Sequence, residues 1–193
     1  MKGCAKDMFM YILLGVIGII ALFWVGVYNN LIKARNGVEG SFSQIDVQLQ
    51  RRNDLIPNVV ETVKGYAEHE RQTLENVTKA RQQLVNLPAD ASPEMINSKS
   101  NSLTSALSRL LVVAEQYPDL KANANFQELQ RSLEDTENKI AVSRQLYNSS
   151  VQTYNEKVQV FPNNVVAGVH GFGEKTYLEA PEAARQAPQV SFD

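Results

Sequence analysis

Residues 125–161 read NFQELQRSLEDTENKIAVSRQLYNSSVQTYNEKVQVF and form the longest uninterrupted periodic segment of this chain. Every seventh residue is apolar or aromatic: Phe126, Leu133, Ile140, Tyr147, Tyr154 and Phe161. A seven-residue period places one apolar stripe on one face of a supercoiling helix. Neither Gly nor Pro interrupts the segment, and Pro162 ends it. We therefore predict a helix about 55 Å long that is the spine of a helical bundle.

The composition is that of a nearly neutral, helical protein. The chain has 193 residues, enough for one domain plus an anchor, and a formal net charge of −2. A net charge this close to zero gives no sign of the basic face of a nucleic-acid-binding protein, so no nucleic-acid partner is expected. Cys4 is the only cysteine, which excludes an intrachain disulfide. Alternating β-branched runs are scarce, so the sequence predicts an all-α fold.

Residues 8–28, MFMYILLGVIGIIALFWVGVY, carry no charge. As a helix they extend about 31 Å, close to the thickness of the hydrocarbon core of a bilayer. Phe23, Trp24 and Tyr28 lie toward one end, where an interfacial aromatic belt is found. A cleaved signal peptide is the alternative, but the run is too long for an ordinary signal core and no A-x-A-like site follows Tyr28. We predict a retained single-pass anchor in the lipid bilayer.

Basic residues flank this segment on both sides. Lys2 and Lys6 precede it, together with the amino terminus, while Lys33 and Arg35 follow it. The positive-inside count is nearly balanced and leans toward a cytoplasmic N-terminus. We therefore expect the folded domain to lie outside the cytoplasm.

Apolar spacing resumes after the anchor in two columns. One column is Phe42, Leu49, Ile56, Val63, Glu70, Val77 and Leu84, and the other is Ile45, Arg52, Val59, Tyr66, Thr73, Ala80 and Leu87. Columns three and four residues apart form a helix–helix seam. Pro57 falls inside this seam, whose phase runs through it unbroken, while Asn53 with Asp54 supplies turn and N-cap chemistry just before it. A break near Asn53 gives pieces that match the other helices in length, so we favour it over one helix kinked at Pro57.

Residues 87–94, LPADASPE, predict the next boundary, with Ser92 as the N-cap and Pro93 at the first helical position. The seam of the helix that follows is Ile96, Leu103, Leu110 and Tyr117, joined by Leu107 and Ala114. Its first turns are rich in Asn and Ser, which makes this helix the weakest. Asn125 and Glu128 are predicted as the cap and its reciprocal partner at the start of the spine.

Beyond Pro162 the pattern becomes irregular. Short helical turns are predicted at residues 165–167 and 182–185. Several apolar residues occur without a long period: Val165, Val166, Val169, Phe172, Tyr177, Leu178 and Phe192. This content is too apolar for a freely disordered segment, so we predict a tail docked on the domain.

Distinctive segments recur in order along the chain. They are YN-x-L at 28–31, RR-x-DLIPNVV at 51–60, VKGYA at 63–67, YPDLKAN at 117–123, E-x-TEN-x-IA at 134–141, YN at 147–148 and 154–155, and FP-x-N at 161–164. With these segments the chain resembles the LemA family over nearly its whole length. The resemblance implies a single-pass bacterial membrane protein that carries an antiparallel four-helix bundle and has no established enzymatic activity. One branch of this family belongs to the magnetosome membrane system, which suggests membrane organisation, but the role of that branch does not extend to this chain.

The predicted fold is therefore all-α, with a transmembrane helix, an antiparallel four-helix bundle and a docked irregular tail. Three long helices replace the four if Pro57 only kinks the first. The predicted segments are a short N-terminal segment (1–7), the transmembrane helix (8–28), the bundle (29–162) and the tail (163–193). The expected location is the bacterial inner membrane, with the bundle outside the cytoplasm.

Polar residues at or beside the seams are the candidate contact residues. Arg52 falls in a seam column, and Glu137 and Arg144 occupy the column beside the aromatic stripe. The neighbouring candidates are Asp54, Glu134 and Asn138. A pocket for a ligand or partner is one interpretation, and a paired polar layer that fixes helix register is the favoured one.

No catalytic residue, metal ligand set or cofactor is predicted. His69 has no second histidine at helical spacing, so it is read as an exposed helix histidine and not as a metal ligand. Residues 168–176, GVHGFGEKT, resemble a P-loop, but Glu174 spoils the G-K-[ST] ending and a helix is expected before it. The glycines are read as turn formers. Tyr147 and Tyr154 are predicted as core residues with their hydroxyls at the bundle edge.

Two functions remain open from the sequence. The first is a noncatalytic membrane-anchored scaffold that self-assembles as a homo-oligomer or holds a membrane-protein partner. The alternative is a sensory or ligand-binding bundle in which polar seam residues recognise a small anion or peptide.

Overall fold

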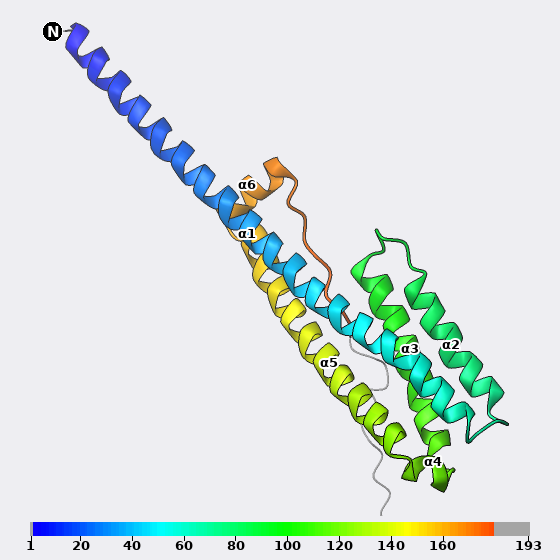
Figure 1. The fold of residues 1–193 in the computed structure, drawn as a ribbon. Coiled ribbons are helices and arrows are strands. Elements are labelled where there is room, and N and C mark those ends of the chain that lie inside the picture. The colour runs from blue at the N-terminus through cyan, green and yellow to red at the C-terminus, as the bar shows by residue number, and fades with distance from the viewer. Residues whose placement is uncertain (1, 180–193) are drawn as a thin grey trace, which may run out of the picture. The chain divides into compact units, whose positions relative to one another are not determined.

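The computed structural model describes residues 2–179, and their side chains from residue 10 onward. Its helices are α1 (Lys2–Lys64), α2 (Arg71–Val85), α3 (Pro93–Ala114), α4 (Pro118–Ala122), α5 (Ala124–Gln159) and α6 (Asn163–His170) (Figure 1). No strand occurs in the described part of the chain. The all-α fold with a long apolar N-terminal helix is confirmed. The antiparallel four-helix order stays a prediction.

The chain divides into two compact units. The first comprises Met1–Gly40 and Ser149–Lys175, and the second comprises Ser41–Asn148 and Thr176–Asp193. Helices α1 and α5 contribute residues to both units, because each runs through a boundary without a break.

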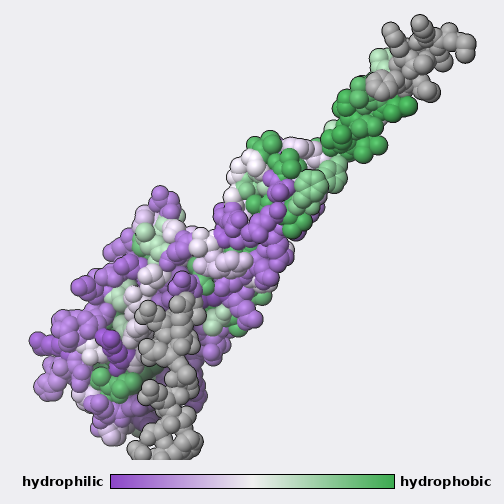
Figure 2. Space-filling view, turned by 180° about the vertical axis from the view of Figure 1, so that it is seen from behind, coloured by the Kyte–Doolittle hydropathy of each residue, from purple (hydrophilic) through white to green (hydrophobic). Residues whose placement is uncertain are grey.

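In the first unit, α1 begins with a run of apolar side chains that nothing in the described structure covers. Met10, Leu22 and Val25 are 50 %, 77 % and 56 % exposed. Figure 2 shows a hydrophobic surface along this stretch of the helix. This part of α1 is long and apolar enough to cross a membrane. It coincides with the predicted anchor.

The rest of the first unit has a small apolar core. It draws on α1, α5, α6 and the chain just after α6. Its buried residues are Val27, Leu31, Val38, Val151, Tyr154, Val166, Ala167 and Phe172. The stripe predicted on the spine therefore contributes to this core through Tyr154.

In the second unit, segments of α1 and α5 share one core with α2, α3 and α4. Helices α2 and α3 lie side by side (Figure 1). The core consists of Ile56, Val59, Val63, Ala67, Leu74, Val77, Leu84, Leu103, Leu107, Leu110, Ala114, Leu120, Phe126 and Leu133. Most apolar members of the predicted columns are buried, in this core or elsewhere along α1 and α5, so the seven-residue pattern identifies most of the buried faces. Tyr66 and Phe161 are exceptions, at 43 % and 76 % exposed.

The favoured helix break near Asn53 is wrong. Helix α1 continues through Pro57 and ends at Lys64. Pro57 has no amide hydrogen for the carbonyl of Asn53, four residues earlier. The Nε atom of Arg81 on α2 donates to that carbonyl at 2.9 Å instead. A partner distant in sequence therefore satisfies the group that the proline leaves open.

The chain turns at residues 65–70, between α1 and α2. Ala67 is buried there, and its amide bonds the carbonyl of Val63 at 2.8 Å. His69 is exposed, as predicted, but it lies in this turn and not on a helix.

Helix starts test two predicted caps. The Ser92 hydroxyl accepts from the amide of Met95 at 3.3 Å, so the predicted cap of α3 is confirmed. The predicted cap of α5 is wrong, because the helix begins at Ala124 and Asn123 precedes it. The Asn123 side chain accepts from the amide of Phe126 at 3.0 Å. Asparagine is equally suited to both positions, so the sequence pattern chose the wrong one.

The tail contains one of the two predicted helical turns as α6. Val166, Phe172 and Leu178 are buried, while Val165, Val169 and Tyr177 are exposed. The tail therefore docks through fewer anchors than predicted. Phe192 and the predicted turn at residues 182–185 lie outside the described residues.

The contact between Arg81 and the Asn53 carbonyl predicts a coupling with Pro57. Arg81→Met should lower the free energy of unfolding by about 1–3 kcal/mol, since it leaves a partly buried carbonyl without a donor. In a Pro57→Ala background, the alanine amide supplies that donor and the same substitution should cost less than about 1 kcal/mol. Urea denaturation of the full chain in detergent measures both. Equal costs in the two backgrounds would contradict this explanation of the unbroken helix.

Candidate functional site

The second unit buries a complete guanidinium group between helices. Arg52 on α1 is 0 % exposed, although it occupies a seam column that is otherwise largely apolar. Its Nη1 atom donates to Thr104 Oγ1 at 2.9 Å and to Glu137 Oε2 at 2.7 Å. Its Nη2 atom donates to Ser100 Oγ at 2.8 Å. Arg52 therefore joins α1 to α3 and α5.

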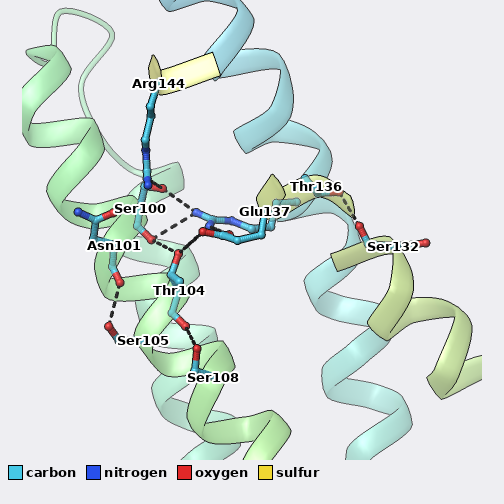
Figure 3. Close-up of polar contacts among 10 residues, drawn as sticks. Ser100, Asn101, Thr104, Ser105, Ser108, Ser132, Thr136, Glu137 and Arg144 are labelled. Carbon is cyan, nitrogen blue, oxygen red and sulfur yellow. Dashed lines mark hydrogen bonds and ion pairs between the residues drawn. The ribbon is translucent and has the colours of Figure 1, made fainter. Parts of the chain in front are cut away.

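The acceptors of Arg52 also bond one another. Thr104 Oγ1 contacts Glu137 Oε1 at 3.2 Å, and Arg144 Nη2 donates to Ser100 Oγ at 2.9 Å. Figure 3 shows Ser100 and Thr104 on one helix facing Glu137 and Arg144 on another. The hydroxyl of Ser100 thus accepts from both arginines, and the five side chains form one network.

The network contains two cations and one anion. Arg52 and Arg144 are both buried, whereas the Glu137 side chain is 36 % exposed. Burial lowers the pKa of Arg52 from its usual value, and the charge and hydrogen bond of Glu137 oppose this shift. Burial also lowers the pKa of Arg144, with Glu137 opposing and Arg52 adding to the shift. Because arginine stays charged in proteins, the network retains one positive charge in excess.

Both arginines also have an unbonded Nε atom. Neither Arg52 Nε nor Arg144 Nε has a hydrogen-bond partner within the described structure. A buried donor without an acceptor is destabilising by about 1–3 kcal/mol. The Nη atoms of the two arginines that take part in the network are therefore hydrogen-bonded, whereas their Nε atoms are not.

A small cavity adjoins the network. Its volume is about 120 Å³. Its lining residues are Arg52, Thr104, Leu107, Ser108, Leu111, Leu133, Glu134 and Glu137. Pockets for drug-sized ligands usually occupy about 300–1,000 Å³. The cavity has room for a few waters or a very small group, with a charged wall and an apolar wall.

Of the six candidate residues, three meet in this network and three do not. Arg52, Glu137 and Arg144 come together. Asp54 is exposed and accepts from Gln50 Nε2 at 2.9 Å, while Asn138 is exposed on α5. Glu134 accepts from Gln130 Nε2 at 3.2 Å, although it also lines the cavity.

Ser100 and Thr104 are the network residues that sequence reasoning missed. Both belong to the Asn- and Ser-rich start of α3, where polarity indicated only a weak helix. The available signal is that Ser100 stands seven residues before Leu107, in the column that continues to Ala114. A small hydroxyl residue in an apolar column opposite a buried arginine is a suitable acceptor.

A second polar feature holds the tail. In the second unit, the Asn148 amide group exchanges two hydrogen bonds with the backbone of Leu178, both at 2.9 Å. In the first unit, Asn155 does the same with Lys175 at 2.9 and 2.8 Å. Each asparagine amide group thus bonds both the N–H and the C=O of one tail residue, as the backbone of a neighbouring strand would in a sheet. The Tyr-Asn pair that recurs at 147–148 and 154–155 is the sequence signal for these asparagines, although the prediction from that repeat concerns only the tyrosines.

The two tyrosines of this repeat behave as predicted. Tyr147 and Tyr154 are 2 % and 1 % exposed. Their hydroxyls donate to the carbonyls of Thr176 at 3.2 Å and Gly173 at 3.0 Å. Burial is the main cause that raises the pKa of each phenol, so both remain neutral donors.

The described residues contain no group of three or more His, Cys, Asp or Glu side chains that could hold a metal ion. The segment that resembles a P-loop begins inside α6, so a helix and not a strand precedes it. Within it Gly171 adopts a φ of 70° and ends α6 as a left-handed cap. This confirms the turn-forming role of that glycine.

A family model described as the LemA family matches residues 41–192. The chain belongs to the LemA family. The matched range contains all five residues of the arginine network. The LemA family is not known for an enzymatic activity.

Individual LemA relatives are distant but extensive matches. The Protein LemA of Metamycoplasma hominis is 30 % identical over 166 residues, which covers 86 % of this chain and 74 % of the relative. The Magnetosome protein MamQ 2 of Paramagnetospirillum magneticum is 23 % identical over 205 residues, covering 94 % and 75 %. The Magnetosome protein MamQ of Magnetospirillum gryphiswaldense is 24 % identical over 179 residues, covering 81 % and 66 %. Together with the exposed apolar helix, these matches fit a membrane-anchored, noncatalytic protein.

The network geometry predicts a difference between two glutamates on α5. Glu137→Ala should lower the free energy of unfolding by about 1–3 kcal/mol, because it removes the carboxylate that faces a buried guanidinium. Glu134→Ala is the matched control and should change it by less than about 0.5 kcal/mol, because among the described residues Glu134 bonds only Gln130, at an exposed position. Thermal unfolding of the full chain by circular dichroism measures both. Equal effects would mean that the ion pair has no structural role.

Proposed function

We propose that this chain is a noncatalytic membrane-anchored scaffold. In this proposal, anchored copies self-assemble or hold another membrane-associated protein, and thereby organise the membrane around them. The observation that carries the proposal is the exposed apolar run of α1 from Met10 to Val25, which suits residence in a bilayer. The cavity beside the arginine network is smaller than an ordinary substrate site.

Anchoring changes how much contact an assembly needs. Copies confined to one bilayer meet at a high effective concentration, so a contact that is weak in solution is sufficient. The contact surface therefore need not be a large apolar patch. In the second unit, most exposed apolar side chains are isolated among polar ones, and this is normal for a protein surface.

One pair of exposed apolar residues departs from that pattern. Val142 and Leu146 are 57 % and 49 % exposed on α5. They are four residues apart, so they lie on the same face of the helix. A second copy that presents the same pair would bury all four side chains in a symmetric contact. We assign this pair, the α5 pair, as the contact between anchored copies.

The scaffold proposal predicts that the full chain crosslinks to itself in lipid nanodiscs or vesicles. Val142→Asp combined with Leu146→Asp should reduce the crosslinked fraction several-fold, because each carboxylate would lie in the contact. Val112→Asp is the matched control: Val112 is an exposed valine on α3 with polar residues one turn away on both sides. It should leave crosslinking unchanged. Monomers at every protein density would contradict self-assembly, and equal losses in both variants would contradict the assignment to α5.

Ligand binding is the second candidate function. It is favoured by the excess positive charge of Arg52 and Arg144 and by their unbonded Nε atoms. A small anion or the carboxylate of a peptide would complement that charge. The two functions differ in what Glu137→Ala does. The scaffold proposal expects it to lower stability, whereas ligand recognition expects the fold to survive while binding of an anion is altered.

A further inference from the structure

We propose that α6 and the turn before it lie in the interfacial region of the bilayer. The first unit would then contact lipid in two ways, through the span in α1 and through an apolar surface formed by Val160, Phe161, Val165 and Val169. We call these four residues the interfacial patch. The proposal rests on the membrane anchor but not on self-assembly.

The first line of evidence is the contact between α6 and the aromatic end of the apolar run. The indole Nε1 of Trp24 donates to His170 Nε2 at 3.1 Å. The rings of Tyr28 and His170 are 4.7 Å apart between centroids. Tyr28 also contacts Phe172, with centroids 5.7 Å apart. The end of α6 and the residues after it are thus fixed to Trp24 and Tyr28.

The second line of evidence is the depth at which those aromatic residues lie. Along a helix that starts its span at residue 8, Trp24 is about 24 Å and Tyr28 about 30 Å from the start. The hydrocarbon core of a bilayer is about 30 Å thick. Trp24 and Tyr28 therefore lie near its boundary, where tryptophan and tyrosine are enriched. His170 must lie at the same level, because it contacts both rings.

The third line of evidence is the surface that α6 leaves uncovered. Val166 and Ala167 pack inward, at 2 % and 1 % exposed. Val165 and Val169, four residues apart, remain 49 % and 67 % exposed on the other side. The preceding Phe161 is 76 % exposed, and Val160 is 57 % exposed. A helix with apolar residues on both sides suits a position between a protein core and lipid.

The charges near the patch agree with a headgroup environment. No acidic residue occurs between Glu156 and Glu174, so the whole of α6 is free of negative charge. Lys157 lies just before the patch, and its ammonium group donates to Asn30 Oδ1, beyond the end of the span, at 2.8 Å. Lysine beside an apolar surface is typical of segments that lie on phospholipid membranes.

The experiment measures lipid access to the patch in the full chain. The protein, with Cys4→Ser to remove its own thiol, is labelled at Val169→Cys with an environment-sensitive fluorophore. It is reconstituted in phosphatidylcholine vesicles in which part of the lipid carries a shallow quencher on the acyl chain. Thr153→Cys, an exposed site on α5 in the same unit, is the matched control. Trp24, the only tryptophan of the chain, reports the depth of the span in the same sample.

The proposal expects a blue-shifted probe at Val169 that is quenched at least twofold more than the probe at Thr153. This difference should stay constant over a tenfold range of protein-to-lipid ratio. Equal quenching at the two sites, with Trp24 quenched, would overturn the proposal. So would an unquenched Trp24, because the span would not end where the depth argument requires. A blue shift at Val169 that grows with protein density would assign the patch to a second copy instead of lipid.

Discussion

The second unit depends on the burial of one guanidinium group. Arg52 is fully buried on α1, and its two Nη atoms bond Ser100 and Thr104 on α3 and Glu137 on α5. The planar guanidinium fixes the directions of these hydrogen bonds, so all of them form together in only one register of the three helices. A shift of α3 by one residue would turn Ser100 away and leave a buried charge without its acceptors, which is far more costly than a change in apolar packing. We expect the apolar core to supply most of the stability and the network to select one arrangement of the helices.

Much of this arrangement follows from the sequence, because the seven-residue period identifies the buried faces. It also places Arg52, Glu137 and Arg144 at or beside those faces, and the structure joins them. The period places Ser100 in the column of Leu107 and Ala114, but it does not show that this hydroxyl or that of Thr104 faces a buried arginine, since small hydroxyl residues occur as often on exposed helix surfaces. The break expected near Asn53 comes from helix lengths, although the period runs unbroken through Pro57. The donor that replaces its missing amide is Arg81, whose proximity to Asn53 results from folding and not from spacing. Local patterns therefore predict which residues are buried better than they predict which distant groups become partners.

The tail illustrates the same distinction. Its apolar residues predict docking, and Phe172 and Leu178 are indeed buried. What holds its backbone is the amide group of an asparagine, once through Asn155 in the first unit and once through Asn148 in the second. Backbone groups left open in an extended segment can pair with other chains, and these side chains satisfy some of those groups in the tail internally.

The central claim, that the guanidinium of Arg52 fixes the helices of the second unit, is tested most directly by Arg52→Lys in the full chain. Lysine keeps the charge and most of the stem, but its single ammonium group cannot bond Ser100, Thr104 and Glu137 in the same geometry. The free energy of unfolding, measured by urea denaturation in detergent, should fall by at least about 2 kcal/mol. A lysine variant within about 0.5 kcal/mol of the natural chain would show that charge alone is sufficient, and would contradict the claim.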